Sequence, residues 1–295
     1  MNKIAKVLQL HNASTYNVDN MCFTEPQLYT IGDKVTFYRV RVFTKNQDDN
    51  GNLKGSQGDL ILKFPTMLCF GISENKSMND PSVISGYSVS CCLWSKDGKT
   101  TEEDKATKLL EQIIQKCKEF LVNIRAKIRR YDLEIRDLKE MDKLLSWKID
   151  TETGNRVEGV GPIFSPKLIE YKGKDGKSSN VGTIFYDEHG QETDFRKYIS
   201  GETKASKKLC DITPAIKIDN IFIGAKTINV QCKVYEADIV QRQLGSRRLL
   251  HPDSKPSSLM VSFSNESNDS GDYGDSGDSD MSDLHKNDLN DFELN

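Results

Sequence analysis

The sequence predicts a mainly β protein, a barrel or sandwich, that carries one long helical insertion and ends in a disordered acidic tail. About eight short runs of β-branched and aromatic residues are separated by turn residues, as in an all-β domain. One stretch, at about residues 101–146, switches to a helical period. No alternation of strands and helices is visible, which argues against most nucleotide-binding α/β folds. We therefore expect one domain over residues 1–243 and a tail over residues 244–295.

The first clear strand is predicted at residues 35–43, which read Val-Thr-Phe-Tyr-Arg-Val-Arg-Val-Phe. Successive side chains in a strand point to opposite faces. One face, which can enter a core, carries Thr36, Tyr38, Val40 and Val42. The other carries Val35 and the mixed aromatic and basic set Phe37, Arg39, Arg41 and Phe43. Aromatic rings stack on bases and cations meet phosphates, so this second face is expected to bind single-stranded nucleic acid. The alternative is a half-buried edge strand whose arginines face water.

Three further strands are expected before the insertion, over residues 59–64, 67–72 and 86–94. Pro65 ends the first of them, because proline cannot continue a ladder of backbone hydrogen bonds. The third alternates between two faces, and Trp94 falls on the more polar one. We expect Trp94 to be a second ring on which a base stacks.

The insertion, at about residues 101–146, is predicted to be helical; if the helix is unbroken from residue 102 to residue 146, it is on the order of 65 Å long at 1.5 Å per residue. Thr101 is a suitable N-cap, and acidic residues follow it in the first turn. Apolar residues recur in steps of four and three, at Leu110, Ile114, Cys117, Leu121, Ile124, Ile128, Tyr131, Ile135 and Leu138. Such a seam packs on a sheet, on the helix itself after a break, or on a partner, including a second copy of the chain. Packing on a partner is the rival hypothesis: a coiled-coil interaction or scaffold protein that uses residues 110–138.

Strands resume after the insertion. Residues 163–172 predict an edge or bulged strand because they contain Pro166, residues 181–186 predict another strand, and residues 217–224 and 227–235 predict a hairpin. In its second arm the outward side chains are expected to be Thr227, Asn229, Gln231 and Lys233. Further DNA contacts, mainly to phosphates, are expected from Lys167, Tyr171, Lys172, Lys174 and Lys177.

The charge is distributed unevenly along the chain. Residues 264–295 hold ten Asp/Glu and one Lys, a formal charge of −9, whereas residues 1–263 hold 34 Asp/Glu and 40 Lys/Arg, a formal charge of +6. A mildly basic body favours a polyanionic partner.

The cysteines and the hydropathy indicate the cellular compartment in which the protein is expected. The seven cysteines follow no regular spacing, which indicates free thiols in a reducing compartment and no zinc ribbon. No apolar run approaches the ~20 residues that span a bilayer, and the N-terminus is too short and polar for a signal peptide. We expect a soluble protein with no membrane partner.

Motifs of catalysis are missing from the sequence. It contains no phosphate-binding Gly-rich loop, no Gly-x-Ser-x-Gly and no His-Glu-x-x-His, and its four histidines are far apart. The run Asp-Glu-His-Gly at 187–190 lies between two expected strands and predicts a surface turn. We therefore expect no enzyme, no cofactor and no metal.

Two stretches of the sequence resemble a known family. One is Phe-Pro-Thr-Met-Leu-Cys-Phe-Gly-Ile at 64–72, followed by the strand and helix described above. The other covers residues 147–169; it begins with Trp-Lys-Ile-Asp-Thr-Glu-Thr-Gly and contains Gly-Val-Gly-Pro-Ile-Phe-Ser-Pro at 159–166. Their order resembles the single-stranded-DNA-binding proteins of the nucleocytoplasmic large DNA viruses, over roughly residues 30–240. The resemblance implies an OB-fold, no catalysis, and a role in viral DNA replication, recombination or repair in the host cytoplasm.

The last residues add a separate feature. The acidic run ends in a short hydrophobic tip that contains Phe292 and Leu294. Many bacterial and phage single-strand binders end similarly and recruit partners with the tip, so replication or repair proteins are expected to bind here. The alternative is a tail that only keeps the protein soluble. Taken together, the sequence favours sequence-independent binding of single-stranded DNA.

Overall fold

The computed structural model describes residues 10–31, 35–47, 53–77, 80–94, 99–172, 179–201 and 208–242. The protein is mainly β, as predicted. Its strands are β1 (Leu10–Asn12), β2 (Met21–Phe23), β3 (Gln27–Ile31), β4 (Val35–Gln47), β5 (Leu53–Lys63), β6 (Met67–Lys76), β7 (Ile84–Cys92), β8 (Leu145–Ser146), β9 (Ile163–Phe164), β10 (Lys167–Leu168), β11 (Glu170–Lys172), β12 (Ser179–Val181), β13 (Ile184–Tyr186), β14 (Glu192–Thr193), β15 (Cys210–Ile223) and β16 (Ile228–Gln241). Its helical elements are η1 (Val18–Asn20), α1 (Thr101–Asn123), η2 (Ile135–Leu144) and η3 (Phe195–Tyr198), where η marks a 3₁₀ segment.

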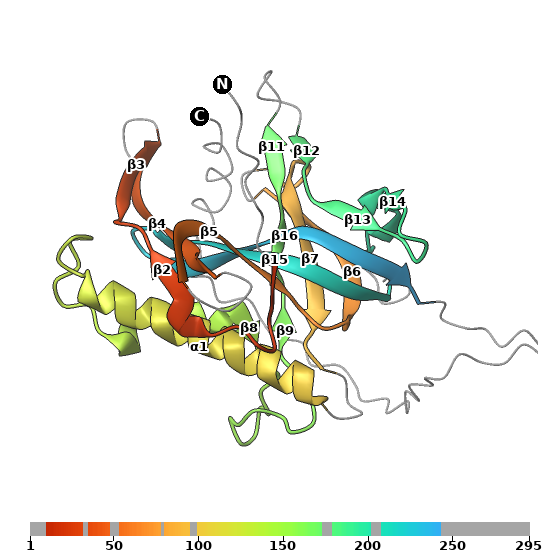
Figure 1. The fold of residues 1–295 in the computed structure, drawn as a ribbon, viewed down its shortest axis with the longest axis horizontal. Coiled ribbons are helices and arrows are strands. Elements are labelled where there is room, and N and C mark those ends of the chain that lie inside the picture. The colour runs from red at the N-terminus through yellow and green to blue at the C-terminus, as the bar shows by residue number, and fades with distance from the viewer. Residues whose placement is uncertain are drawn as a thin grey trace, which may run out of the picture.

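A long hairpin formed by β15 and β16 lies at the centre of the sheet (Figure 1). The two strands pair antiparallel along their whole length, so the predicted hairpin is confirmed and extends further than predicted. The other edge of β15 pairs in turn with β6, β5 and β4, each along a different part of the strand. The outer edge of β16 pairs with β10 and β13, both parallel to it.

The strand pairings also form a closed circuit. β6 pairs with β7, β7 meets β10, and β10 pairs with β16, so the pairings run from β15 through these strands and back to β15. The strand predicted over residues 163–172 is present as the three short pieces β9, β10 and β11, with a break at Pro166. Proline has no N–H to give to a ladder, which accounts for the break.

Helix α1 begins at a capping box. The side chain of Thr100, one residue before the predicted N-cap, accepts a hydrogen bond from the Glu103 N–H at 3.2 Å, and the Glu103 carboxylate accepts from the Thr100 N–H at 2.7 Å. The helix runs along one side of the sheet (Figure 1), and the seam residues Leu110, Cys117 and Leu121 are fully buried in the core it shares with the strands. The prediction that the seam is buried is therefore confirmed for α1, and its partner is the sheet.

The helix is broken inside the insertion, so it does not reach the length expected of an unbroken helix over residues 102–146. α1 ends at Asn123, and Arg129 adopts a positive φ of 57°, which a continuing helix does not allow. The guanidinium of Arg130 then donates hydrogen bonds to the carbonyls of Gly224, at the β15–β16 turn, and Ala225, which ties the chain back onto the sheet. Beyond the break Tyr131 is 68% exposed, so the seam does not continue as one stripe and the coiled-coil hypothesis has no support.

One large hydrophobic cluster contains residues of both α1 and the sheet, and a second, small cluster lies on β3, β4 and β15. Val40 and Val42 of β4 enter the large cluster, as predicted. The small cluster consists of Phe37 and Phe222, with Tyr29 packed against them. The hairpins β3–β4 and β11–β12 project from the side of the sheet away from α1 (Figure 1).

The structure also bears on the expected free thiols and on the expected absence of a membrane span. All seven cysteines are unpaired and six are buried, in agreement with the expected free thiols. Within the described ranges, no helix is long and apolar enough to cross a membrane. The tail over residues 244–295 lies outside the described residues, so its expected disorder stays a prediction.

Candidate nucleic-acid interface

Three lysines form a row across three neighbouring strands. The register pairs Lys217 of β15 with Lys233 of β16, and Lys233 with Lys167 of β10. Residues directly opposite each other on paired strands point to the same face of a sheet. The adjacent residues Ile218 and Cys232 point the other way, into the core beneath α1. The lysines therefore share the face opposite α1.

A second row lies beside the first. Arg41 of β4 is paired with Asn220 of β15, and Arg39 is paired with Phe222. A bulge between Ile218 and Asn220 inserts one residue, and this brings Asn220 to the same face as Lys217 although the two are an odd number of residues apart. We call the set Arg39, Arg41, Lys167, Lys217 and Lys233 the cationic face.

Two carboxylates connect members of the cationic face. Asp219, the bulged residue, lies 2.8 Å from the Nζ of Lys217 and 3.6 Å from that of Lys233. Asp59 pairs with Arg41 and lies 3.6 Å from the Nζ of Lys217. The five cations and these two carboxylates sum to a formal charge of +3.

The carboxylate and the lysine at the centre of this network both stay charged at neutral pH. Burial acts to raise the pKa of Asp219, but the ammonium groups of Lys217 and Lys233 outweigh it and hold that pKa below its ordinary value. Burial acts to lower the pKa of Lys217, but the carboxylates of Asp219 and Asp59 outweigh it and raise that pKa. The network is therefore a fixed arrangement of charges.

Phe37 does not offer an open ring to a base, so the first predicted stacking residue is corrected. It is only 2% exposed, because its ring packs on Phe222 with centroids 5.3 Å apart and is stacked on Tyr29 at 5.4 Å. Tyr29 of β3 is half-buried, and the guanidinium of Arg39 lies 5.3 Å above its ring. Tyr29 is therefore an aromatic residue beside the cations that is partly open to a ligand.

Trp94 is also corrected. Its side chain is 9% exposed and packs edge-to-face against Trp147 with centroids 5.5 Å apart. Gly161 lies so close that a Cβ there would sit 2.8 Å from Cδ2 of the indole. Trp94 is a core residue that needs a glycine beside it, and it has no open face for a base.

The other residues predicted to contact DNA differ in exposure and in location. Phe43 is half-buried opposite Asp59, and Tyr171 is 46% exposed on β11, where its ring lies against Gly182. Arg39, Arg41 and Lys167 lie on the cationic face as described. Lys172 ends β11, but its side chain is outside the description, and four predicted residues lie outside the described residues altogether: Lys174, Lys177, Phe292 and Leu294.

Sequence reasoning missed four residues of this face, namely Tyr29, Lys217, Asn220 and Lys233. The alternation in residues 227–235 did predict that Lys233 and Gln231 point outward, and their partial exposure, beside buried Val230 and Cys232, agrees. The strand order, which places β16 between β15 and β10, was needed to bring Lys233 beside Lys217 and Lys167.

The acidic turn at residues 187–190 has the predicted structure. The Asp187 carboxylate accepts hydrogen bonds from the N–H groups of His189 and Gln191, at 2.9 and 3.0 Å, and Gly190 has a φ of 69°. In the described part of the chain, no group of three His, Cys, Asp or Glu side chains is placed to hold a metal ion.

Comparison with known proteins identifies a family. Residues 14–285 match the sequence profile of the family described as "Protein of unknown function (DUF2738)". The chain belongs to this family. No curated protein matches it. Among solved structures, this DUF2738 protein is similar to gp2.5, a single-stranded DNA binding protein encoded by bacteriophage T7, with a TM-score of 0.32 and 10% sequence identity over 70% of this chain and 100% of that chain.

The cationic face of the DUF2738 protein has the chemistry of a polyanion site. Arginine and lysine side chains can pair with phosphates, and Tyr29 offers a ring beside them. The amides of Asn220 and Gln231, which are joined by a hydrogen bond of 3.2 Å, can donate to and accept from polar groups between the phosphates.

Proposed function

We propose that this DUF2738 protein binds single-stranded DNA across the cationic face and catalyses no reaction. The observation that carries the proposal is the gathering of five cations, with two carboxylates, on the sheet face opposite α1. Nucleic-acid backbones attract such a face by releasing their counterions, without regard to sequence.

The side chains between the cations favour a single strand over a duplex. Bases of a single strand are open to stacking, and Tyr29 offers a partly exposed ring. The hairpins on either side of the face project away from α1 (Figure 1) and can flank a flexible strand.

An OB-like architecture forms part of the proposal. Its support is the closed circuit of pairings through β15, β6, β7, β10 and β16, since an OB-fold is a five-stranded, partly open barrel. The resemblance to the viral single-strand binders further supports a role in viral DNA replication, recombination or repair in the host cytoplasm.

The proposal is tested by titrating the protein into fluorescent poly-dT and into a duplex of the same length. Each titration is carried out at two salt concentrations. We expect tight binding of poly-dT, much weaker binding of the duplex, and an affinity that falls as salt rises. Equal affinity for the duplex, or an affinity that salt does not change, would contradict it.

A charge-matched pair of variants locates the site. Arg39→Ala with Arg41→Ala should reduce the slope of log affinity against log salt by roughly two, because each residue is expected to meet about one phosphate. The control is Lys105→Ala with Lys127→Ala, which also removes two positive charges, but near α1, where Lys105 is exposed and Lys127 is ion-paired with Glu25. If the control lowers the slope as much, the cationic face is not the site.

A further inference from the structure

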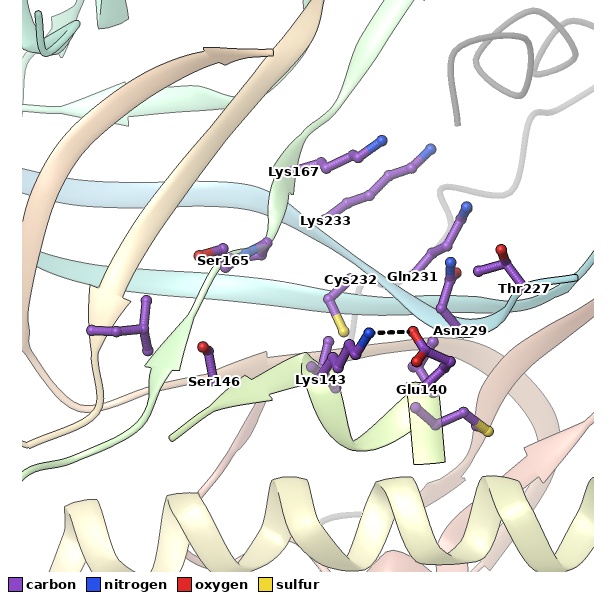
Figure 2. Close-up of a pocket in the computed structure, with 15 residues that line it drawn as sticks. Glu140, Lys143, Ser146, Ser165, Lys167, Thr227, Asn229, Gln231, Cys232 and Lys233 are labelled. Atoms are coloured by element: carbon purple, nitrogen blue, oxygen red, sulfur yellow. Dashed lines mark ion pairs between the residues drawn. The ribbon is translucent and has the colours of Figure 1, made fainter. Parts of the chain in front are cut away.

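A pocket of about 280 Å³ lies along a part of β16 that has only one neighbour. In the described structure, the segment from Ile228 to Cys232 pairs with β15 on one side, and the pairings of its other edge begin only at Lys233. Residues of β10 and η2 form the opposite walls of the pocket (Figure 2).

Pro166 explains why the edge stays open here. β10 is two residues long and begins directly after this proline, which has no N–H to extend the pairing toward Ile228. The Pro166 carbonyl instead accepts a hydrogen bond from the Val89 N–H of β7 at 3.0 Å. The chain is thereby held on β7, and a gap remains beside β16.

The walls of the pocket differ in chemistry. On the β10–β16 side, Lys167 and Lys233 extend side by side in the same direction (Figure 2). On the η2 side, Lys143 is paired with Glu140 at 2.8 Å. Neutral polar side chains line the space between, from Ser146, Ser165, Thr227, Asn229 and Gln231. The cationic wall is therefore continuous with the cationic face through Lys233.

The size and the polar groups indicate the class of ligand. The volume lies just below the roughly 300–1,000 Å³ of small-molecule pockets, so it suits one nucleotide and not a folded partner. Carboxamides can donate and accept at once, as base edges require. The oxygen of Gln231 accepts a hydrogen bond from Asn220, which leaves its amide nitrogen as the end that can donate to a ligand.

We propose that this pocket is a nucleotide subsite: the phosphate lies between Lys167 and Lys233, and the base edge meets Asn229 and Gln231. The inference rests on the proposed function. A strand that lies on the cationic face reaches the pocket by way of Lys233, which belongs to both. The subsite gives the protein a modest preference among bases in addition to its sequence-independent binding to the backbone.

The test uses the full chain, fluorescent dT oligonucleotides and the double variant Asn229→Ala with Gln231→Ala. We expect about a tenfold loss of affinity with an unchanged salt slope, because neither amide neutralises a phosphate. Lys167→Ala should instead reduce the slope by about one. The matched control is Gln112→Ala, an exposed amide on α1, which should change neither quantity.

The outcomes separate the subsite from the proposed function. If the folded double variant binds as tightly as the wild type, the subsite is overturned while single-strand binding stands. If the wild type binds no oligonucleotide, the proposed function fails, and ligand-detected NMR with thymidine 5′-monophosphate decides the pocket alone: a signal that the double variant loses supports it, and no signal overturns it. If the double variant melts early, the near-isosteric Asn229→Asp and Gln231→Glu replace it, and each should weaken oligonucleotide binding by repelling phosphate.

Discussion

Three side chains contact one another in series on the sheet face opposite α1, namely Phe37, Tyr29 and Arg39. Phe37 is the inner member, packed on Phe222, and Arg39 lies over the outer ring, that of Tyr29. The burial of each ring in this series determines its role, because a buried ring contributes to stability and a partly exposed ring can contact a ligand.

Phe37→Ala should destabilise the protein by about 3–5 kcal/mol, because it empties a buried site in the small cluster. Urea unfolding measures this loss. Tyr29→Ala is the comparison: it should cost less stability and lower the affinity for single-stranded DNA, by about 1–3 kcal/mol if one base stacks on the ring. A Phe37→Ala variant with wild-type stability would show that the ring is not a core residue.

Asp219→Asn should lower the stability at pH 7 by about 3 kcal/mol, since it removes one partner of a buried ion network. The folded pKa of Asp219 lies below the unfolded value of about 3.9. Its contribution is therefore present above about pH 4 and is lost as the pH falls through the folded pKa. Thermal melts from pH 7 to pH 3 should show a flatter acid decline for Asp219→Asn than for the wild type.

The exposed residue Asp132 provides the control for that measurement. Asp132→Asn should leave the pH dependence of the melting temperature as it is in the wild type. If Asp219→Asn gives the same curve as Asp132→Asn, the buried network does not control acid stability.

At the scale of elements, α1 and the break after it determine how the insertion is used. The helix covers one side of the sheet, and the turn after Asn123 directs the chain back toward β15 and β16 through Arg130. The apolar period persists in the sequence past this break, but Ile128 and Leu138 are buried while Tyr131 and Ile135 are exposed. The seam therefore has two parts with different environments.

Leu121→Asp and Tyr131→Asp form a matched pair along the seam. Leu121 is fully buried under the sheet, so a carboxylate there should unfold the domain or lower its melting temperature strongly. Tyr131 is 68% exposed, and the same substitution should be tolerated. Thermal melts and the mass in solution measure both. A loss of oligomer without unfolding in Leu121→Asp would restore the coiled-coil hypothesis.

At the scale of the whole molecule, the body and the tail carry opposite charge. Residues 1–263 have a formal charge of +6 and residues 264–295 a formal charge of −9. A tethered acidic segment has an effective concentration on the order of millimolar near the body. The tail is therefore expected to compete with DNA for the cationic face, in addition to recruiting partners through Phe292 and Leu294.

A chain that ends at Phe263 should bind single-stranded DNA more tightly than the full chain at low salt. The difference should shrink at higher salt, because screening weakens the attraction between tail and body. Parallel anisotropy titrations of the two chains measure it. Equal affinities at low salt would leave the tail as a solubilising segment or a hook for partners.

The sequence by itself determined the local structure of this protein. Strand alternation placed Val40 and Val42 inward, and it placed Gln231 and Lys233 outward. The apolar seam predicted a helix that packs by one face, and its start was placed within one residue of the true cap at Thr100. These features depend on side chains a few residues apart, so they can be predicted from a single stretch of sequence.

Only the tertiary structure decided which segments meet. The ring of Phe37 is buried because β15 brings Phe222 against it, and Trp94 is buried because Gly161 and Trp147 close around it. The lysine row exists because β16 lies between β15 and β10. Burial and strand order arise from contacts between residues far apart in the chain, and no local pattern carries that information.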